Sequence, residues 1–71
     1  MNALKTARFF RGISQARLAK MVGLDAAIIS RLETDVLRDT PAVIRWKKKI
    51  AEALNTPVEV LFRNPENAGG D

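Results

Sequence analysis

Two residue types that carry much of protein chemistry are absent from this chain: its 71 residues include no cysteine and no histidine. Disulfides, thiol chemistry and zinc sites built on these two residues are therefore excluded. Most pairs of nucleophile and base are excluded too, because histidine is the commonest general base. The acid and base groups that remain are Asp, Glu and Lys, and helix caps or helix surfaces account for most of the carboxylates. We therefore predict no enzyme, no cofactor and no metal, and stability that comes from packing.

Long apolar runs are lacking as well. No stretch approaches the length of about 18 apolar residues that a membrane-spanning helix needs, and no signal-peptide pattern is present. Together with the lack of cysteine, this predicts a soluble cytoplasmic protein that makes no membrane contact.

The charge that is present is mostly positive. Twelve Lys and Arg stand against eight Asp and Glu, which gives a net charge of +4, and the sequence pI is near 10.1. Residues 1 to 31 hold a net charge of +5, since Asp25 is their only acidic residue. Their cations are Lys5, Arg8, Arg11, Arg17, Lys20 and Arg31. Such a balance is typical of a domain that binds a polyanion.

Apolar residues recur at spacings of three and four along most of the chain, and no strand alternation or internal repeat occurs. The pattern predicts five helices, over residues 3 to 11, 14 to 23, 25 to 34, 40 to 54 and 56 to 63. They would form one all-α domain over residues 1 to 63 with a small core. The last eight residues, 64 to 71, have no large apolar side chain, so we expect a disordered tail there.

Cap residues define several helix ends. Ser14 can cap the second helix. Thr40 followed by Pro41 predicts a cap and a first helical residue. Thr56 with Glu59 three residues later predicts a capping box at the start of the fifth helix. In the first helix, the stem of Arg11 is expected on the inward side.

Trp46, the only tryptophan, lies at helical spacing from Val43 and Ile50, which predicts a core residue rather than a base-stacking one. The three lysines at positions 47 to 49 are consecutive and spread over about 200° of the helix. Because they cannot all face one DNA strand, a solvated face is the favoured interpretation.

The stretch SQARLAKMVGLDAAIISRLE, which begins at residue 14, joins two short helical patterns at one glycine, Gly23. Ala19 is small where the two helices would touch, and Ile29 and Leu32 would lock the second helix onto the first. Two helices crossing through so short a glycine turn form a helix-turn-helix unit, whose second helix can lie in the DNA major groove. A plain helical bundle is the alternative, and Ala19 and Gly23 together argue against it.

The segments SQARLAKMVGL and IISRLE resemble the lambdoid phage repressor and Cro-like helix-turn-helix family, often called the xenobiotic-response-element family. IAEALNTPVEVLF resembles the closing helices of the same family. The resemblance implies a compact five-helix, lambda-repressor-like bundle of bacterial or phage origin. It also implies a homodimer that binds double-stranded DNA at a palindromic operator.

The resemblance assigns roles to individual positions. It implies that Gln15 contacts a phosphate or a base edge, and that Arg8 and Glu33 form a salt bridge between the first and third helices. The expected DNA-binding residues are Gln15, Arg17, Asp25, Ala26, Ala27, Ser30, Arg31, Thr34 and Arg38. Ala26 and Ala27 depart from the polar residues common at these positions and can offer only methyl contacts to thymine. Direct base recognition would then fall mainly to Arg31.

The sequence is compatible with several functions. The favoured one is a small transcriptional regulator of the repressor or Cro type, and an antitoxin or a restriction-modification controller that represses its own operon is a related one. A protein-interaction adaptor is an interpretation of another class. The adjacent Phe9 and Phe10 suggest a partner surface, although Phe10 could instead pack on the fifth helix and Phe9 could lie singly on the surface.

Overall fold

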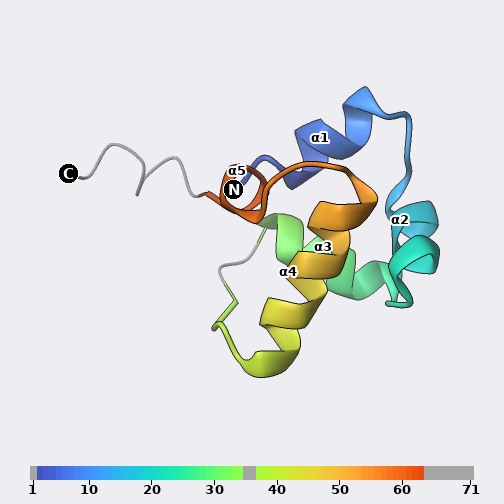
Figure 1. The fold of residues 1–71 in the computed structure, drawn as a ribbon. Helices are drawn as coiled ribbons and strands as arrows, with labels where there is room; N and C mark the ends of the chain where they lie inside the picture. Colours follow the sequence, from blue (N-terminus) through green and yellow to red (C-terminus); the bar gives the residue numbers. More distant parts are fainter. Residues whose placement is uncertain (1, 35–36, 64–71) are drawn as a thin grey trace.

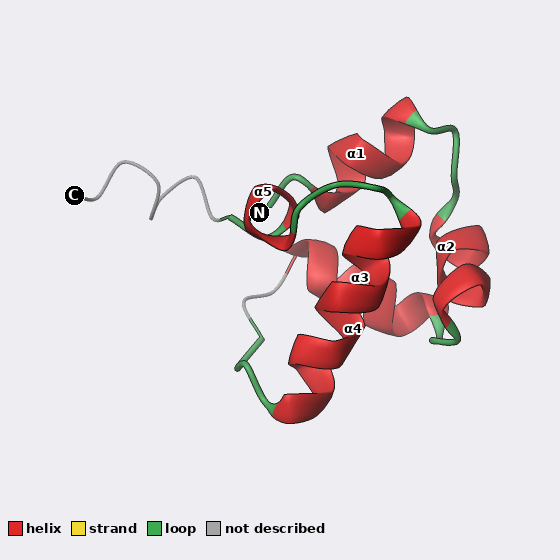
Figure 2. Cartoon of the chain, in the orientation of Figure 1, coloured by secondary structure: helices red, strands yellow, loops and turns green. Residues whose placement is uncertain are grey.

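The computed structural model describes residues 2–34 and 37–63, and this part of the chain is all-helical, as predicted (Figures 1 and 2). Its helices are α1 (Leu4–Phe10), α2 (Gln15–Val22), α3 (Ala26–Thr34), α4 (Pro41–Ala53) and α5 (Val58–Leu61). The expected tail over residues 64 to 71 lies outside the described residues.

The helices surround one small apolar core. Leucine and isoleucine side chains from all five helices or their ends are almost wholly buried in it, and each contributes about 1.5–3 kcal/mol relative to an exposed position. The largest fully buried side chains are Leu4, Leu18, Ile29, Leu32, Ile50, Leu54 and Leu61.

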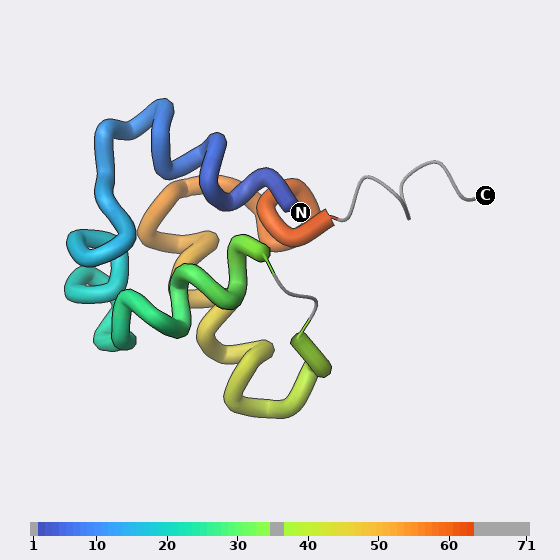
Figure 3. The backbone as a smooth tube through the Cα atoms, turned by 180° about the vertical axis from the view of Figure 1, so that it is seen from behind, coloured from blue at the N-terminus to red at the C-terminus, as the bar shows by residue number. Residues whose placement is uncertain are grey.

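The arrangement leaves α3 and α4 on opposite sides of the molecule. Figure 1 shows α4 toward the viewer, whereas Figure 3, from behind, shows α3 in front. The helix α2 packs on both of them, α1 packs on α3, and α5 packs on α4. The backbone N–H of Ala3 donates to the carbonyl of Leu61 at 3.0 Å, which ties the start of α1 to α5.

Two of the predicted caps are confirmed. The Ser14 hydroxyl accepts a hydrogen bond from the Arg17 N–H at 3.0 Å at the start of α2. At the start of α4, the Thr40 hydroxyl accepts from the Val43 N–H at 3.2 Å, and Pro41 is the first helical residue. Each cap satisfies a backbone donor that the first turn of a helix leaves without a partner.

The capping box predicted for the fifth helix is wrong. The Thr56 hydroxyl donates to the Leu54 carbonyl at 2.9 Å instead. Pro57 occupies the N-cap position of α5, and no side-chain cap is present there. The hydroxyl is used at the end of α4 because only a short turn separates the two helices.

The expected inward position of Arg11 is also wrong, because Arg11 is exposed beyond the end of α1. Arg8 takes the inward position, one helical turn after Leu4. Burial of its guanidinium is possible because the carboxylate of Glu33, also buried, lies against it.

Trp46 packs against the core, as predicted, but Lys47 is not part of a solvated face. Its ammonium lies 2.9 Å from the Asp39 carboxylate and 5.3 Å from the ring centroid of Phe62. The stem of Lys47 thus covers apolar surface between α4 and α5, while Lys48 and Lys49 are exposed.

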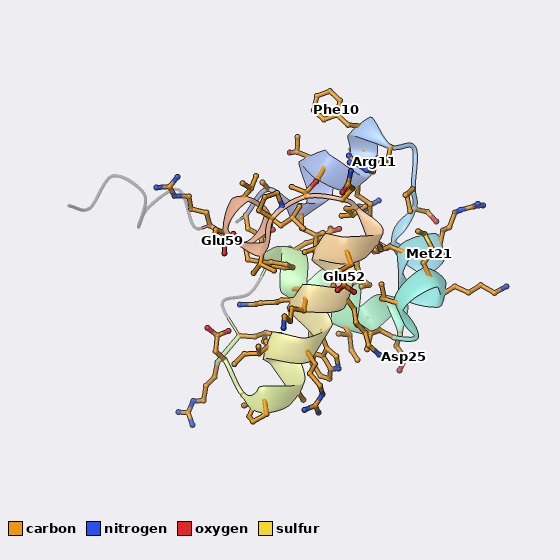
Figure 4. The ribbon with its side chains drawn as sticks, in the orientation of Figure 1. Phe10, Arg11, Met21, Asp25, Glu52 and Glu59 are labelled. Carbon is orange, nitrogen blue, oxygen red and sulfur yellow. The ribbon has the colours of Figure 1, made fainter. Side chains whose placement is uncertain are left out.

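Phe10 does not pack on α5. Its side chain is 85% exposed and that of Phe9 is 73% exposed, and Figure 4 shows Phe10 projecting outward from the end of α1. The alternative in which Phe10 packs on the fifth helix is therefore wrong.

Candidate nucleic-acid interface

The turn between α2 and α3 is built on Gly23. This residue adopts a left-handed conformation with φ 74° and ψ 33°, and its N–H donates to the Ala19 carbonyl. The N–H of Leu24 donates to the same carbonyl at 2.8 Å. Both bonds satisfy the carbonyl of Ala19 in the last turn of α2, and α3 begins three residues after Gly23. The glycine turn predicted from the sequence is confirmed.

Gly23→Ala is expected to destabilise the domain by about 1–2 kcal/mol, because a residue with a Cβ is strained in the left-handed region. A Cβ added at position 23 meets no atom within 4 Å, so the cost is one of backbone conformation and not of space. Urea unfolding followed by circular dichroism measures the effect. Gly23→Asn should cost less, since Asn tolerates this conformation, and equal losses for both substitutions would contradict this explanation.

One side of α3 is fixed to the rest of the domain. Ile29 and Leu32 are buried at 0% and 2% exposure, and Ala19 on α2 is buried at 3% where α2 and α3 pack together. The small side chain of Ala19 fits this close crossing. The helix therefore cannot turn about its axis without opening the core.

The opposite side of α3 faces solvent. Ala27, Arg31 and Thr34 are exposed, and Ser30 between them is half-buried. The Thr34 hydroxyl donates to the Ser30 carbonyl at 3.0 Å, so its proton is used in a hydrogen bond within α3. At the start of the helix, Asp25 is exposed, and Figure 4 shows it at the turn between α2 and α3. Ala26 is half-buried, so the first turn of α3 offers little beyond the methyl group of Ala27.

A polar cluster joins α3 to α1 and α2, and we call it the Glu33 junction after its central carboxylate. The Arg8 Nε donates to one Glu33 oxygen at 2.7 Å, and the Gln15 amide donates to the other at 2.9 Å. A further guanidinium nitrogen of Arg8 donates to the Ile13 carbonyl at 2.8 Å. Glu33 is only 3% exposed. The junction thus contains the ion pair that the family resemblance implied, and it connects three helices.

Gln15 makes a hydrogen bond within the protein that the sequence did not indicate. It was expected to contact DNA, and that expectation stays a prediction, but one donor of its amide already holds Glu33. An amide nitrogen has two N–H donors, so one remains for a phosphate. A contact of this kind would link the DNA backbone directly to the Glu33 junction.

Asn2 was missed by the sequence analysis. Its amide nitrogen donates to the Leu32 carbonyl at 2.6 Å, and its amide oxygen accepts from the Leu4 N–H at 3.0 Å. One side chain therefore accepts from the first backbone N–H of α1 and also satisfies a carbonyl in the last turn of α3. An Asn two residues before an apolar helix is a recognisable cap signal, but its contact with α3 could not be read from spacing.

Two other expected DNA-binding residues are placed at the ends of elements. Arg17 is exposed in the first turn of α2, and Arg38 is exposed in the segment before α4. Arg17 thus lies in the helix that precedes α3 in the chain, and Arg38 lies in the segment between α3 and α4.

The described residues contain no group of three or more acidic residues placed to hold a metal ion, and every buried side-chain polar atom among them has a partner. None of the helices in residues 2–34 and 37–63 has the length and apolar composition that crossing a bilayer requires.

These features define the helix-turn-helix class: two helices cross through a left-handed glycine turn, apolar side chains of the second helix are buried, and its other face is exposed. Comparison with family models gives the same result: the helix-turn-helix model matches residues 4–61. The chain belongs to this family, the xenobiotic-response-element or lambda repressor and Cro-like helix-turn-helix proteins. Comparisons with curated proteins and with solved structures gave no significant match. Membership of the family makes the chain a DNA-binding transcription regulator.

Proposed function

We propose that the protein is a small regulator of the repressor or Cro type that binds double-stranded DNA sequence-specifically. In this proposal, a homodimer occupies a palindromic operator and α3 of each protomer enters the major groove. The observation that carries it is the one-sided burial of α3: Ile29 and Leu32 are buried on one side, while Ala27 and Arg31 are exposed on the other. The major groove is wide enough to admit a helix presented in this way.

The proposed contacts divide by their chemistry. Arg31 would donate two hydrogen bonds to a guanine, Ala26 and Ala27 would contact thymine methyl groups, and Ser30 and Asp25 would lie beside the bases. Gln15, Arg17 and Arg38 would contact the phosphate backbone, which fixes the orientation of the protein, and Thr34 would lie near that backbone. The excess of cations in residues 1 to 31 supports this division.

Selection of bound sequences from a pool of random duplex DNA tests the proposal. We expect a palindromic motif whose half-sites lie about one helical turn, roughly 34 Å, apart. An enriched motif with a single half-site would contradict the dimer, and a pool without any enriched motif would contradict sequence-specific binding.

Salt titration tests the phosphate contacts separately. The logarithm of the binding constant should fall linearly with the logarithm of salt concentration, with a slope of about −0.9 for each phosphate neutralised. Fluorescence anisotropy of a labelled operator duplex at several salt concentrations measures this slope. A flat plot would count against phosphate contacts by Arg17 and Arg38.

Two other functions use the same chain differently. An antitoxin or a restriction-modification controller would bind its own operator through the same surface. A protein-interaction adaptor is favoured by one observation, the exposure of Phe9 and Phe10, because aromatic side chains are common anchors of protein interfaces. Failure to enrich any DNA, together with binding of one protein that Phe10→Ser abolishes, would establish the adaptor.

A further inference from the structure

The Glu33 junction fixes the chain at two residues near the start of α2. The carbonyl of Ile13 accepts a hydrogen bond from the Arg8 guanidinium at 2.8 Å. The amide nitrogen of Gln15, the first residue of α2, donates to Oε1 of Glu33 at 2.9 Å. Because Glu33 belongs to α3, these bonds hold the start of α2 against the last turn of α3. Figure 3 shows α2 and α3 side by side, and the two helices pack on each other.

The Glu33 carboxylate determines which way the Gln15 amide points. An ionised carboxylate accepts hydrogen bonds and donates none, so it binds the nitrogen of the amide and not its oxygen. One N–H of that nitrogen is used on Glu33, and the other N–H is directed elsewhere. Gln15 is half-buried, whereas Glu33 is only 3% exposed. A phosphate at the surface can therefore reach Gln15 but cannot reach Glu33.

Arg8 removes an electrostatic obstacle to such a contact. A carboxylate behind Gln15 would repel an approaching phosphate, since both groups are negative. The Arg8 guanidinium balances that charge, because its Nε lies 2.7 Å from Oε2 of Glu33. Arg8 is itself only 9% exposed, so the two opposite charges are paired inside the protein. The surface beside Gln15 thus carries no uncompensated charge from Glu33.

From these contacts we propose that Glu33 is a positioning residue for DNA binding: it touches no DNA, but it orients the amide of Gln15 toward a phosphate. Glutamine is among the side chains that lose much rotamer freedom when they are ordered. Since Glu33 orders Gln15 in the free protein, this loss is not incurred when DNA binds. The inference rests on the proposed function, in which Gln15 contacts the DNA backbone.

A purely structural role for the junction has a different consequence. If Glu33 only stabilised the fold, its removal would weaken DNA binding by the same factor whether or not residue 15 carries an amide. If Glu33 positions Gln15, the amide contributes to binding only while Glu33 is present. The two effects are then not additive, and a comparison of variants in two backgrounds measures the difference.

The first test uses the unaltered chain and NMR of its side-chain amide groups. In the free protein, one proton of the Gln15 amide should be shifted and protected from exchange with water, because it is bonded to Glu33. The second proton should exchange freely. Addition of duplex DNA at low salt should shift and protect the second proton as well. Two freely exchanging protons in the free protein would overturn the proposal, since the amide would then not be held before DNA binds.

The second test compares Gln15→Met in two backgrounds by fluorescence anisotropy of a labelled duplex. In the unaltered protein, Gln15→Met should weaken binding about tenfold. The salt slope should not change, because the amide carries no charge. In the background with Arg8→Met and Glu33→Met together, the same substitution should weaken binding less than about twofold. Replacing both charges at once leaves no buried charge alone, so this background is chosen to stay folded.

Asn2→Ala supplies the matched control background. Asn2 also binds α3 through its amide, at 2.6 Å from the Leu32 carbonyl, but it makes no contact with Gln15 or Glu33 in the hydrogen bonds above. Gln15→Met should therefore still weaken binding about tenfold in the Asn2→Ala background. If Asn2→Ala reduces the effect of Gln15→Met as strongly as loss of Glu33 does, any loosening of α3 is sufficient and Glu33 has no positioning role.

The remaining outcomes separate the inference from the proposed function. An equal effect of Gln15→Met with and without Glu33 would overturn the inference, and so would no effect in the unaltered protein. Binding of all duplexes without sequence preference would overturn only the proposed function, because a phosphate contact needs no operator. Absence of any duplex binding would overturn both. Circular dichroism verifies that each variant is folded, and if the variant lacking both charges unfolds, the NMR result on the unaltered chain decides.

Discussion

Glu33→Ala is expected to destabilise the domain by about 3–5 kcal/mol, since the substitution leaves a buried guanidinium without its partner. Arg8 is buried against Glu33, and the two side chains are separated by 2.7 Å between Nε and Oε2. Gln15 would also lose its acceptor. The change is a large fraction of the stability of so small a domain, and chemical unfolding of the purified protein measures it.

A double-mutant cycle isolates the pair. Arg8→Ala, Glu33→Ala and the double variant should show a clear coupling energy, because removing both partners leaves no buried charge alone. The ion pair between Lys47 and Asp39 is the matched control: its aspartate side chain is 65% exposed, so Asp39→Ala should cost less than about 1 kcal/mol. A coupling energy near zero for Arg8 and Glu33 would contradict a structural role for the junction.

Arg31→Ala is expected to weaken binding to the selected operator by about 1–3 kcal/mol, roughly 5-fold to 150-fold. It should also relax the preference at one base pair of each half-site, while affinity for random duplex changes much less. The reason is that Arg31 is the only residue on the exposed face of α3 whose side chain can donate bidentately to a guanine. Arg31→Lys should restore affinity only in part, because an ammonium cannot form the same pair.

Arg38→Ala supplies the contrast. A phosphate contact carries no sequence information, so this substitution should weaken all duplexes alike and lower the salt slope by about 1. Anisotropy titrations of operator and random duplexes with both variants make the comparison. If Arg31→Ala weakens the two duplexes equally, then Arg31 is a phosphate contact, and specificity comes from thymine methyl groups, from Gln15 or from DNA shape.

Much of the fold could be predicted because its signals are local. Ser14, Gly23, Thr40 and Pro41 act on the backbone within four residues of their own positions, and all four do what their residue types predict. Thr56 shows the limit of local reasoning: the same type of signal occurs there, but its hydroxyl found an acceptor at the end of the preceding helix. Two possible partners at similar sequence distance cannot be distinguished by spacing alone.

In the candidate site, too, some features follow from local sequence signals and others do not. The exposed face of α3 follows from helical periodicity, since buried Ile29 and Leu32 leave Ala27 and Arg31 on the other side. The contacts made by Gln15 and Asn2 do not follow from it. Gln15 reaches a residue 18 positions away and Asn2 one 30 positions away, and such contacts depend on how the helices cross.

The sequence by itself therefore determined the helices, the glycine turn and the side of α3 that is exposed, because periodicity and backbone conformation are properties of neighbouring residues. Only the tertiary structure decided that Arg8 and not Arg11 is buried, and that Gln15 shares the carboxylate of Glu33. It also decided that the ammonium of Lys47 lies over the ring of Phe62. A charged side chain can be buried only where a partner from another helix meets it, and the packing of the helices sets which side chains meet.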